Sequence, residues 1–450
     1  MNAPEKPCVV VVGAGFGGLT LARALRKAPV EVLLIDRQNY HTFQPLLYQV
    51  ATAGLEPEEI AHAVRGIFQR QKNFHFRFGA VVGVDRAARV VRLEDGDRIL
   101  YDYLVLATGV STNFFGIDGA EEHSFPLKSL PEAVALRSHI IRQFEKADCD
   151  PSLLDQGALT FVVVGGGPTG VEMAGALVEL FQMVLRKDFP RLPLERARVV
   201  LVEASPRLLG AFHETSQGYA LRKLARRGVE VRLDEPVVRI DAAAVTLKSG
   251  ERIPMQTLIW AAGVRTTPLA DVLGMEQTRG GRLVVEPDLS VPGDPNVFVI
   301  GDMAGSRDED GHLHPQLAPA AMQGANHVAR QIRRRMAGQP PTAFRYKNKG
   351  VMATIGRNAA VAEFPVLLRA SDLRSSGFIA WVMWLILHLV LLIGFRNRLN
   401  VLINWAWNYF TYDRSARLIM HPPRASKPAE AGPSIEGEIL ETLKTPLGAQ

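Results

Sequence analysis

Two glycine-rich segments, each following a run of apolar β-branched residues, constrain the fold of this chain more than any other feature. The runs 9–12 and 161–164 predict buried parallel strands. The glycines that follow them are Gly13, Gly15, Gly18, Gly165, Gly167 and Gly170. Glycines at this spacing let a backbone turn approach a pyrophosphate at the N-terminus of the next helix. One fingerprint alone is weak evidence, but the pair predicts an α/β protein that binds two dinucleotides.

An acidic residue ends the next predicted strand after each fingerprint. We expect Asp36, its neighbour Arg37, and Glu203 to contact the nucleotides. A carboxylate in this place accepts hydrogen bonds from ribose hydroxyls and repels a 2′-phosphate, so both units favour an unphosphorylated ribose. Arg207 leaves a phosphorylated ribose open as an alternative. A solvated strand end is the other possible role of either carboxylate.

The interval between Gly170 and Glu203 is longer than the corresponding interval in the first unit. A predicted helix from Val171 to about Lys187 accounts for much of the difference. The segment 188–193 contains two prolines, which predict a loop after that helix.

Three further apolar runs end in turns of small residues. Thr108 and Gly109 follow the first run, Gly263 follows the second, and Asp302 lies in the turn after the third. Such turns let the backbone pass close to a cofactor, so we expect these residues to line the cofactor sites. This order of motifs resembles the two-dinucleotide flavoprotein reductases, in which FAD lies on the first fold and NAD(P)H on an inserted second one. The resemblance implies that Asp302 holds the ribityl chain of the flavin.

The length of 450 residues and the apolar content of 47% predict two or three globular domains. We expect a discontinuous FAD-binding domain made of residues 1–115 and 290–345. An NADH-binding domain, 116–289, is inserted between its parts. Residues 346–421 form a C-terminal region for membrane association or dimerisation, and 422–450 have the composition of a disordered tail.

Several classes of protein are disfavoured by the sequence. The chain has two cysteines, Cys8 and Cys149, which form neither a disulfide framework nor a redox pair. We find no metal site, because the histidines lack ligand spacing. The cluster 333–335 of three arginines ends a predicted helix and indicates capping or membrane contact, so we expect no nucleic-acid partner.

The C-terminal third contains two strongly apolar segments. Residues 377–394 carry no formal charge over 18 positions, the lower limit for a membrane span, and their pattern leaves open whether they span, lie on a surface or are buried. Further on, Asn400, Asn404 and Asn408 recur every four residues among aliphatic and aromatic residues. This spacing predicts an amphipathic helix with one narrow polar stripe.

Composition and charge indicate what this C-terminal region contacts. The chain has a net charge of +6, and Trp and Tyr favour the membrane interface. Anionic phospholipid is therefore the expected partner surface, and a dimer interface or a cover over the flavin domain is the alternative. The arginines that could meet lipid head groups are Arg396, Arg398, Arg414 and Arg417.

Together these features resemble the type II NADH dehydrogenases, and the likeness runs from about Pro7 to Met420. The segments 39–51 and 344–357 and the helical end are its most specific parts. The resemblance implies FAD and NADH as cofactors and electron transfer from NADH to a membrane quinone without proton pumping. It also implies a homodimer bound as a peripheral, monotopic protein to the cytoplasmic face of the cell membrane.

One departure from the family pattern concerns the quinone side of the flavin. Members of the family commonly carry two glutamines there, but this chain has Pro319 in place of the first and keeps Gln323 as the second. Proline offers neither an amide side chain nor a backbone N–H to a quinone carbonyl. The alternatives are a related reductase with a non-quinone acceptor and a non-catalytic FAD/NAD redox sensor.

Glu172, Gln323 and Lys349 are the expected catalytic residues. Glu172 lies just inside the helix after Gly170, and the resemblance implies a place close to the flavin and a role in relaying between substrates. Its alternative role is to complement the helix dipole. Lys349 is expected near reduced flavin or the quinone, with a solvated loop lysine as the alternative. We expect His41 and His388 to be structural.

Overall fold

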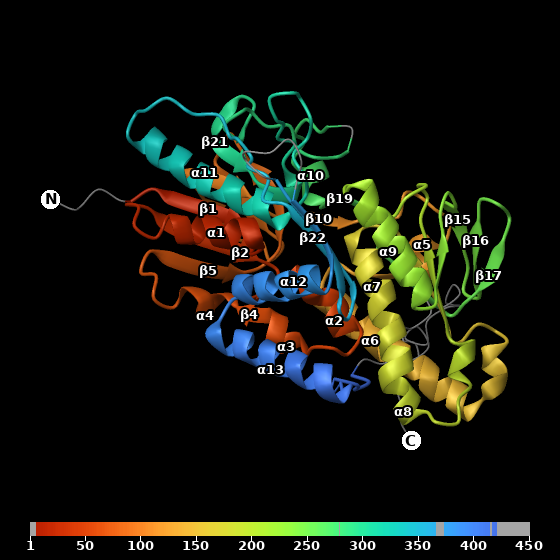
Figure 1. Cartoon of the computed structure of the whole chain (residues 1–450). Helices are drawn as coiled ribbons and strands as arrows, with labels where there is room; N and C mark the ends of the chain where they lie inside the picture. The colour runs from red at the N-terminus through yellow and green to blue at the C-terminus, as the bar shows by residue number, and fades with distance from the viewer. Residues whose placement is uncertain (1–5, 279, 366–372, 415, 421–450) are drawn as a thin grey trace, which may run out of the picture.

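A computed structural model describes residues 6–278, 280–365, 373–414 and 416–420. The predicted disordered tail, 422–450, lies outside the described residues. Two mainly parallel sheets form the body of the molecule, and the C-terminal strands and helices pack against both (Figure 1).

The first sheet takes strands from both ends of the predicted discontinuous domain. In spatial order its strands are β20 (Ser290–Val291), β21 (Asp294–Val299), β9 (Tyr103–Leu106), β1 (Cys8–Val12), β2 (Glu31–Asp36) and β5 (Phe74–Phe78). All neighbours are parallel except β20 and β21. Helices α1 (Phe16–Ala24) and α11 (Ala318–Met336) lie side by side over this sheet (Figure 1). The predicted discontinuous dinucleotide fold is confirmed.

The second sheet is formed by the inserted segment and is entirely parallel. Its strands, in spatial order, are β11 (Phe125–Pro126), β18 (Thr257–Trp260), β12 (Thr160–Val164), β13 (Arg198–Val202) and β14 (Val229–Arg232). Its main helices are α6 (Leu130–Cys149), α7 (Pro168–Glu179) and α9 (Glu214–Arg226). A π-helical turn, Leu180–Leu185, and α8 (Arg186–Asp188) prolong α7, so the helical rod reaches the end predicted for it.

The two connections between these sheets pair with each other. The outgoing strand β10 (Val110–Thr112) and the returning strand β19 (Val264–Thr266) form an antiparallel ribbon. The remaining short elements are β3 (Tyr40–Thr42), α2 (Leu47–Ala51), α3 (Pro57–Ile60), β4 (Ala61–Ala63), α4 (Val64–Phe68), β6 (Val81–Asp85), β7 (Val90–Leu93), β8 (Arg98–Leu100), α5 (Ala120–His123), β15 (Val237–Ile240), β16 (Ala244–Leu247), β17 (Arg252–Pro254) and α10 (Leu269–Val272).

The C-terminal region begins with a sheet that was not predicted. Strands β22 (Val351–Gly356), β23 (Ala359–Phe364) and β24 (Leu373–Gly377) form an antiparallel sheet, and only then do α12 (Phe378–Leu391) and α13 (Phe395–Thr411) follow. The two helices are the predicted helical part. Of the helices in the described ranges, none combines the length and the apolarity needed to cross a bilayer.

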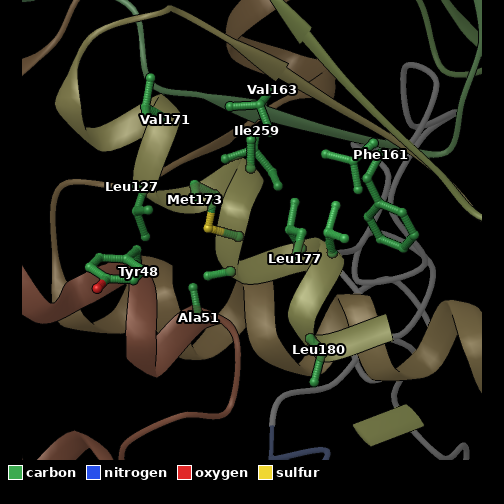
Figure 2. Packing of buried hydrophobic residues seen from close by; sticks show 14 of the residues in the cluster. Tyr48, Ala51, Leu127, Phe161, Val163, Val171, Met173, Leu177, Leu180 and Ile259 are labelled. Carbon is green, nitrogen blue, oxygen red and sulfur yellow. The ribbon is translucent and has the colours of Figure 1, made fainter. Parts of the chain in front are cut away.

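Helix α7 lies at the centre of the main hydrophobic core. Figure 2 shows Met173 and Leu177 of α7 between Tyr48 on one side and Phe161 of the second sheet on the other. All four are buried, with less than a tenth of each side chain exposed. The helix that starts at the second fingerprint is therefore held rigidly between the two nucleotide units.

Two members of the predicted asparagine stripe of α13, Asn404 and Asn408, face the protein together with Asn397, whereas the third member, Asn400, is exposed. Asn397 donates to the backbone oxygens of Glu58 and Ala61, and Asn404 donates to the carboxylate of Glu59. Asn408 donates to Gly54 O. The side-chain amides of these three asparagines thus form hydrogen bonds within the protein.

The apolar side chains of α12 and α13 consequently point outward. We call this surface the apolar face, and its exposed members are Phe378, Ile379, Ile386, Leu387, Val390, Leu391, Phe395, Leu399, Leu402, Ile403, Trp407 and Phe410. Two of the arginines predicted to meet lipid head groups point inward instead, because Arg414 pairs with Glu179 and Arg417 with Asp188. Arg396 and Arg398 are exposed.

Candidate active site

The two glycine turns have nearly the same geometry. Gly13 and Gly165 adopt φ of 110° and 111°, in the region that favours glycine. A Cβ on Gly18 would lie 1.9 Å from Gly13 O, and one on Gly170 would lie 1.8 Å from Gly165 O, so each helix packs too closely on its turn for any side chain. The sequence analysis had predicted these glycines for their approach to a pyrophosphate, and the structure adds this packing of helix on turn.

The remaining fingerprint glycine of each unit faces open space. A Cβ on Gly15 or Gly167 would meet no atom within 4 Å. These residues precede α1 and α7, and neither helix start is capped by a side chain. Free backbone N–H groups and the positive end of the helix dipole favour a phosphate at each start. The turns therefore fit the pyrophosphates of two dinucleotides.

The acidic residues hold these turns in place. Asp36 accepts hydrogen bonds from Ala14 N at 2.6 Å and Gln38 N at 2.7 Å. Glu203 accepts from Gly166 N and from Ser205 N, the equivalent pair in the second unit. Burial raises the pKa of Asp36. The structure thus adds a backbone-positioning role, and ribose binding stays a prediction.

The two arginines near these carboxylates are both on the surface. Arg37 is exposed beside Asp36. Arg207 donates to the carboxylate of Glu214 at 3.0 Å. The guanidinium of Arg207, which had left binding of a phosphorylated ribose open as an alternative, is therefore paired with Glu214.

The small-residue turns meet where the first sheet receives its connections. Thr108 Oγ1 lies 2.8 Å from Thr267 Oγ1 and donates to Met303 Sδ. Gly109 has φ of 70° with open space on its Cβ side. Asp302 lies in the short helical turn Gly301–Met303, and burial raises the pKa of its carboxyl group. The structure brings the predicted flavin-side residues Thr108 and Asp302 to the same end of the sheet as the first fingerprint.

An apolar cavity of about 460 Å³ lies beside helix α7. Helices α2, α7, α12 and α13 and strand β22 supply its walls. Phe378, Ile386, Leu402 and Phe410 line it and also belong to the apolar face, so the cavity opens onto that surface. Sequence analysis did not predict this cavity.

One stripe of α7 and its π-helical continuation runs along the cavity. Glu172, Ala176, Glu179, Met183 and Val184 all contribute to the lining. Intervals of three and four residues place them on the same side of a helix. The helix that begins at the second fingerprint therefore ends as a wall of the cavity.

Glu172 is the acidic group on the inner part of this stripe. It accepts a hydrogen bond from Thr354 N at 3.2 Å and is hydrogen-bonded to Trp384. Burial raises its pKa to about 8, against the lowering effect of these two hydrogen bonds. The group is therefore mostly protonated at neutral pH. The alternative role of Glu172, to complement the helix dipole, does not explain why its carboxyl group is buried and its pKa raised.

Three aromatic or amide side chains beside Glu172 were missed by sequence reasoning. Trp405 Nε1 donates to Gln49 Oε1 at 2.8 Å, and Gln49 Nε2 donates to Tyr48 Oη at 2.9 Å. Burial raises the pKa of Tyr48, so its hydroxyl stays protonated. Tyr48 and Gln49 lie within the family-like segment 39–51, which is the signal that could have identified them.

A charge cluster closes the other end of the stripe. Glu179 accepts from Arg227 and from Arg357 N, and Arg414 Nη2 lies 3.6 Å from its carboxylate. Arg357 also stacks on the rings of Tyr409 and Tyr412. These contacts fasten the end of α13 to α7.

Gln323 and Lys349 are not part of the cavity lining. Gln323 Nε2 donates to Lys347 O at 2.9 Å, and its Oε1 accepts from Lys347 N at 2.9 Å. The glutamine thus positions the segment that carries Lys349, whose side chain is exposed. Pro319 lies in the first turn of α11, where a proline loses no helical hydrogen bond.

Of the two histidines expected to be structural, His41 is buried and His388 is partly buried. Burial lowers the pKa of His41 and of His388 to about 4, so both rings stay neutral at pH 7. His41 Nδ1 lies 2.9 Å from Ala14 O, and the His388 ring stacks on Trp384. Among the described residues, the side chains of Asp308, Asp310 and His312 lie close enough to hold one metal ion, but all three are exposed.

Comparison with known proteins agrees with this arrangement. Residues 7–325 match the pyridine nucleotide-disulphide oxidoreductase family, and residues 348–412 match the NDH2 C-terminal domain. The type II NADH:quinone oxidoreductase Ndh of Mycobacterium tuberculosis is 38% identical over 427 residues, which cover 91% of this chain and 90% of that protein. The chain belongs to the type II NADH:quinone oxidoreductases.

Other members of this family and related folds support the assignment. NdhA of M. tuberculosis is 39% identical over 418 residues, covering 89% of this chain and 87% of that protein. A structure of NDH2 from Plasmodium falciparum in complex with NADH has the same fold, with a TM-score of 0.83 at 19% identity over 93% of this chain and 100% of that chain. The family predicted from the sequence is confirmed. Its reaction, electron transfer from NADH through FAD to a quinone, is the predicted one.

Proposed function

We propose that this type II NADH:quinone oxidoreductase receives its quinone in the apolar cavity. The observation that carries the proposal is Glu172, a carboxyl group on the wall of a cavity of about 460 Å³ that opens onto the apolar face, where burial raises its pKa to about 8. A quinone combines a small polar ring with a long apolar tail. A cavity with polar groups inside and an apolar mouth fits both parts.

The two nucleotide units supply the other half of the reaction. The first fingerprint, Asp36, Thr108 and Asp302 would hold FAD, and the second fingerprint with Glu203 and Gly263 would hold NADH. Bound FAD accepts hydride equivalents from NADH and delivers two electrons to the acceptor. In this proposal residues 1–115 and 290–345 form the FAD-binding domain, and residues 116–289 form the NADH-binding domain.

Reduction of a quinone to a quinol also consumes two protons. One of them would arrive with the hydride that NADH supplies. Glu172 donates the other to a quinone oxygen and is reprotonated by water, because its raised pKa keeps the proton bound until the oxygen becomes basic. Tyr48, oriented by Gln49 and Trp405, donates a hydrogen bond to the quinone ring. Gln323 would act by positioning the segment of Lys349, to whose neighbour Lys347 it is hydrogen-bonded.

The apolar face provides the route by which a membrane quinone enters. Contiguous exposed apolar helices rimmed by Arg396 and Arg398 suit an anionic phospholipid surface. The protein would lie as a peripheral, monotopic homodimer on the cytoplasmic face of the cell membrane, within a respiratory chain. Sedimentation in mild detergent measures the oligomeric state.

An anaerobic experiment tests the proposed reaction. NADH is added to the purified flavoprotein, bleaching of the visible flavin band is recorded, and a short-chain quinone is then added. We expect bleaching followed by rapid return of the band. Bleaching without return would leave a reductase with another acceptor or a redox sensor, while no bleaching would contradict the assignment of the second fingerprint.

A further inference from the structure

A phenylalanine ring lies directly on Gly263, at the edge of the second nucleotide unit. A Cβ added to Gly263 would fall 2.2 Å from Cζ of Phe115 and 2.5 Å from Cε2, so the ring occupies the side of this glycine that a side chain would take. Phe115 is nevertheless 60% exposed. An apolar ring that is open to solvent on most of its surface makes a weak contact.

The backbone under this ring is held by hydrogen bonds. Asn113 Oδ1 accepts from Phe115 N at 2.9 Å, and Asn113 O accepts from Trp260 Nε1 at 2.9 Å. Phe115 adopts φ of 53°, which is uncommon for a residue other than glycine and is held here by these bonds. The turn follows the ribbon of β10 and β19, so it sits where the chain passes from one nucleotide unit to the other.

The covered glycine belongs to the surface that a nucleotide approaches. A Cβ on Gly165 would lie 2.8 Å from the backbone of Ala261 and Ala262, so the second fingerprint packs against the two residues that precede Gly263. Ligands of parallel sheets bind outside the carboxyl ends of the strands, and Gly263 follows the carboxyl end of β18. A glycine there lets the backbone approach the ligand closely.

We propose that Phe115 is a gate for NADH. Its ring covers Gly263, and NADH reaches this part of its site only when the side chain rotates away. The apparent affinity and the association rate then equal those of the uncovered site multiplied by the fraction of molecules in which the ring is displaced. This inference uses the assignment of the second fingerprint to NADH.

Anaerobic stopped-flow reduction of the full-length flavoprotein by NADH tests the gate. The dependence of the flavin-bleaching rate on NADH concentration separates the association rate from the limiting rate of hydride transfer. We expect Phe115→Ala to raise the association rate by roughly threefold or more, because the covered state is lost. The limiting rate stays within about twofold of wild type.

Two variants act as controls. Phe115→Tyr keeps the ring and is expected to retain the wild-type association rate. Leu100→Ala removes an apolar side chain that is 70% exposed on β8 and is expected to change neither rate. If Phe115→Ala does not retain flavin, Phe115→Asn provides the same test, because asparagine tolerates positive φ.

An unchanged or slower association rate in the variant without the ring overturns the gate. A slower rate would show that the ring is an attractive contact to NADH. If NADH fails to bleach the flavin of the wild-type protein, the nucleotide assignment itself is wrong, and the gate falls with it. Bleaching of wild type with no gain in the variant rejects the gate alone.

Discussion

At the scale of single residues, the carboxyl group of Glu172 determines how pH acts on the proposed reaction. Burial raises its pKa to about 8, so the proton is present below this pH and is lost as the pH rises through it. We expect the rate of flavin reoxidation by a short-chain quinone to fall as the pH increases through about 8. Stopped-flow absorbance over a series of buffers measures this profile.

Glu172→Gln provides the matched control, since the amide keeps the size of the side chain but has no titrating proton. We expect reoxidation of this variant to be about a hundredfold slower and to lose the descending limb. A raised folded-state pKa also means that stability falls with rising pH between about 4.5 and 8. The variant should therefore unfold at a higher temperature than wild type at pH 8. A limb that persists in Glu172→Gln belongs to another group.

Glu203 provides a second prediction at this scale. Its carboxylate accepts hydrogen bonds from Gly166 N and Ser205 N and so holds the second glycine turn. We expect Glu203→Ala to raise the dissociation constant for NADH about tenfold or more, the cost of lost charge-assisted hydrogen bonds, while the flavin stays bound. Titration of the flavin spectrum measures both. Undiminished NADH affinity would remove Glu203 from the site.

Residues whose role follows from local chain geometry were predictable from sequence. The glycines, Asp36 and Glu203 act within one strand-turn-helix unit, so spacing alone identifies them. Tyr48 and Trp384 were not found, because their importance depends on contact with Glu172 from distant parts of the chain. Spacing says nothing about such contacts.

At the scale of elements, α13 offers a comparison within one helix. Asn404 donates to Glu59 on the inner side, whereas Asn400, one turn earlier, is exposed. We expect Asn404→Ala to reduce the free energy of unfolding by about 1–2 kcal/mol, because it leaves the buried carboxylate of Glu59 with one partner fewer. Asn400→Ala should change it by less than about 0.5 kcal/mol. Thermal and denaturant unfolding measure both variants.

Equal effects of the two substitutions would mean that helix propensity, and not the contact with Glu59, determines the outcome. The comparison is sensitive because both changes replace the same residue type in the same helix. The flavin spectrum reports whether either variant disturbs the cofactor domain.

The period of α13 was predictable, but the direction of its polar side was not. A four-residue asparagine repeat indicates a helix with one polar stripe, and such a stripe usually faces water. Here carboxylate and carbonyl groups of residues 54–61 lie opposite and take up the amides. The strands β22 to β24 were missed for a related reason. The alanines of β23 and the polar residues of β24 have low strand propensity, and these segments gain strand character from pairing with their neighbours.

At the scale of the whole molecule, the apolar face predicts membrane binding. Phe395 and Trp407 are 80% and 58% exposed on this face. We expect Phe395→Ser with Trp407→Ser to weaken binding to vesicles containing anionic phospholipid by at least about tenfold, from the loss of buried apolar area. Vesicle flotation measures binding, and activity with a water-soluble quinone should be retained.

Phe78→Ser is the control for this experiment, because Phe78 is 56% exposed but lies on β5, away from α12 and α13. It should bind vesicles like wild type. Loss of dimer without loss of vesicle binding in the double variant would instead make the apolar face a contact between subunits.

The two-sheet architecture was foreseeable because each nucleotide unit is encoded by a continuous pattern, and its order along the chain implies the insertion. The cavity was not foreseeable. Its walls come from residues as far apart as Tyr48 and Arg414, and no local pattern records that they meet. The apolar face was anticipated as a surface for lipid, with a dimer interface or a cover over the flavin domain as the alternative, and not as the opening of a cavity.

The helical rod from Pro168 to Asp188 also limits how this scaffold tolerates change in length. Each added residue rotates everything beyond it by about 100°. One insertion before Glu179 would therefore turn Glu179 and Met183 away from the cavity and leave the fingerprint untouched. Natural length variation and engineered grafts of a different nucleotide unit should accordingly be confined to the loop after Asp188, which lies outside the helical rod.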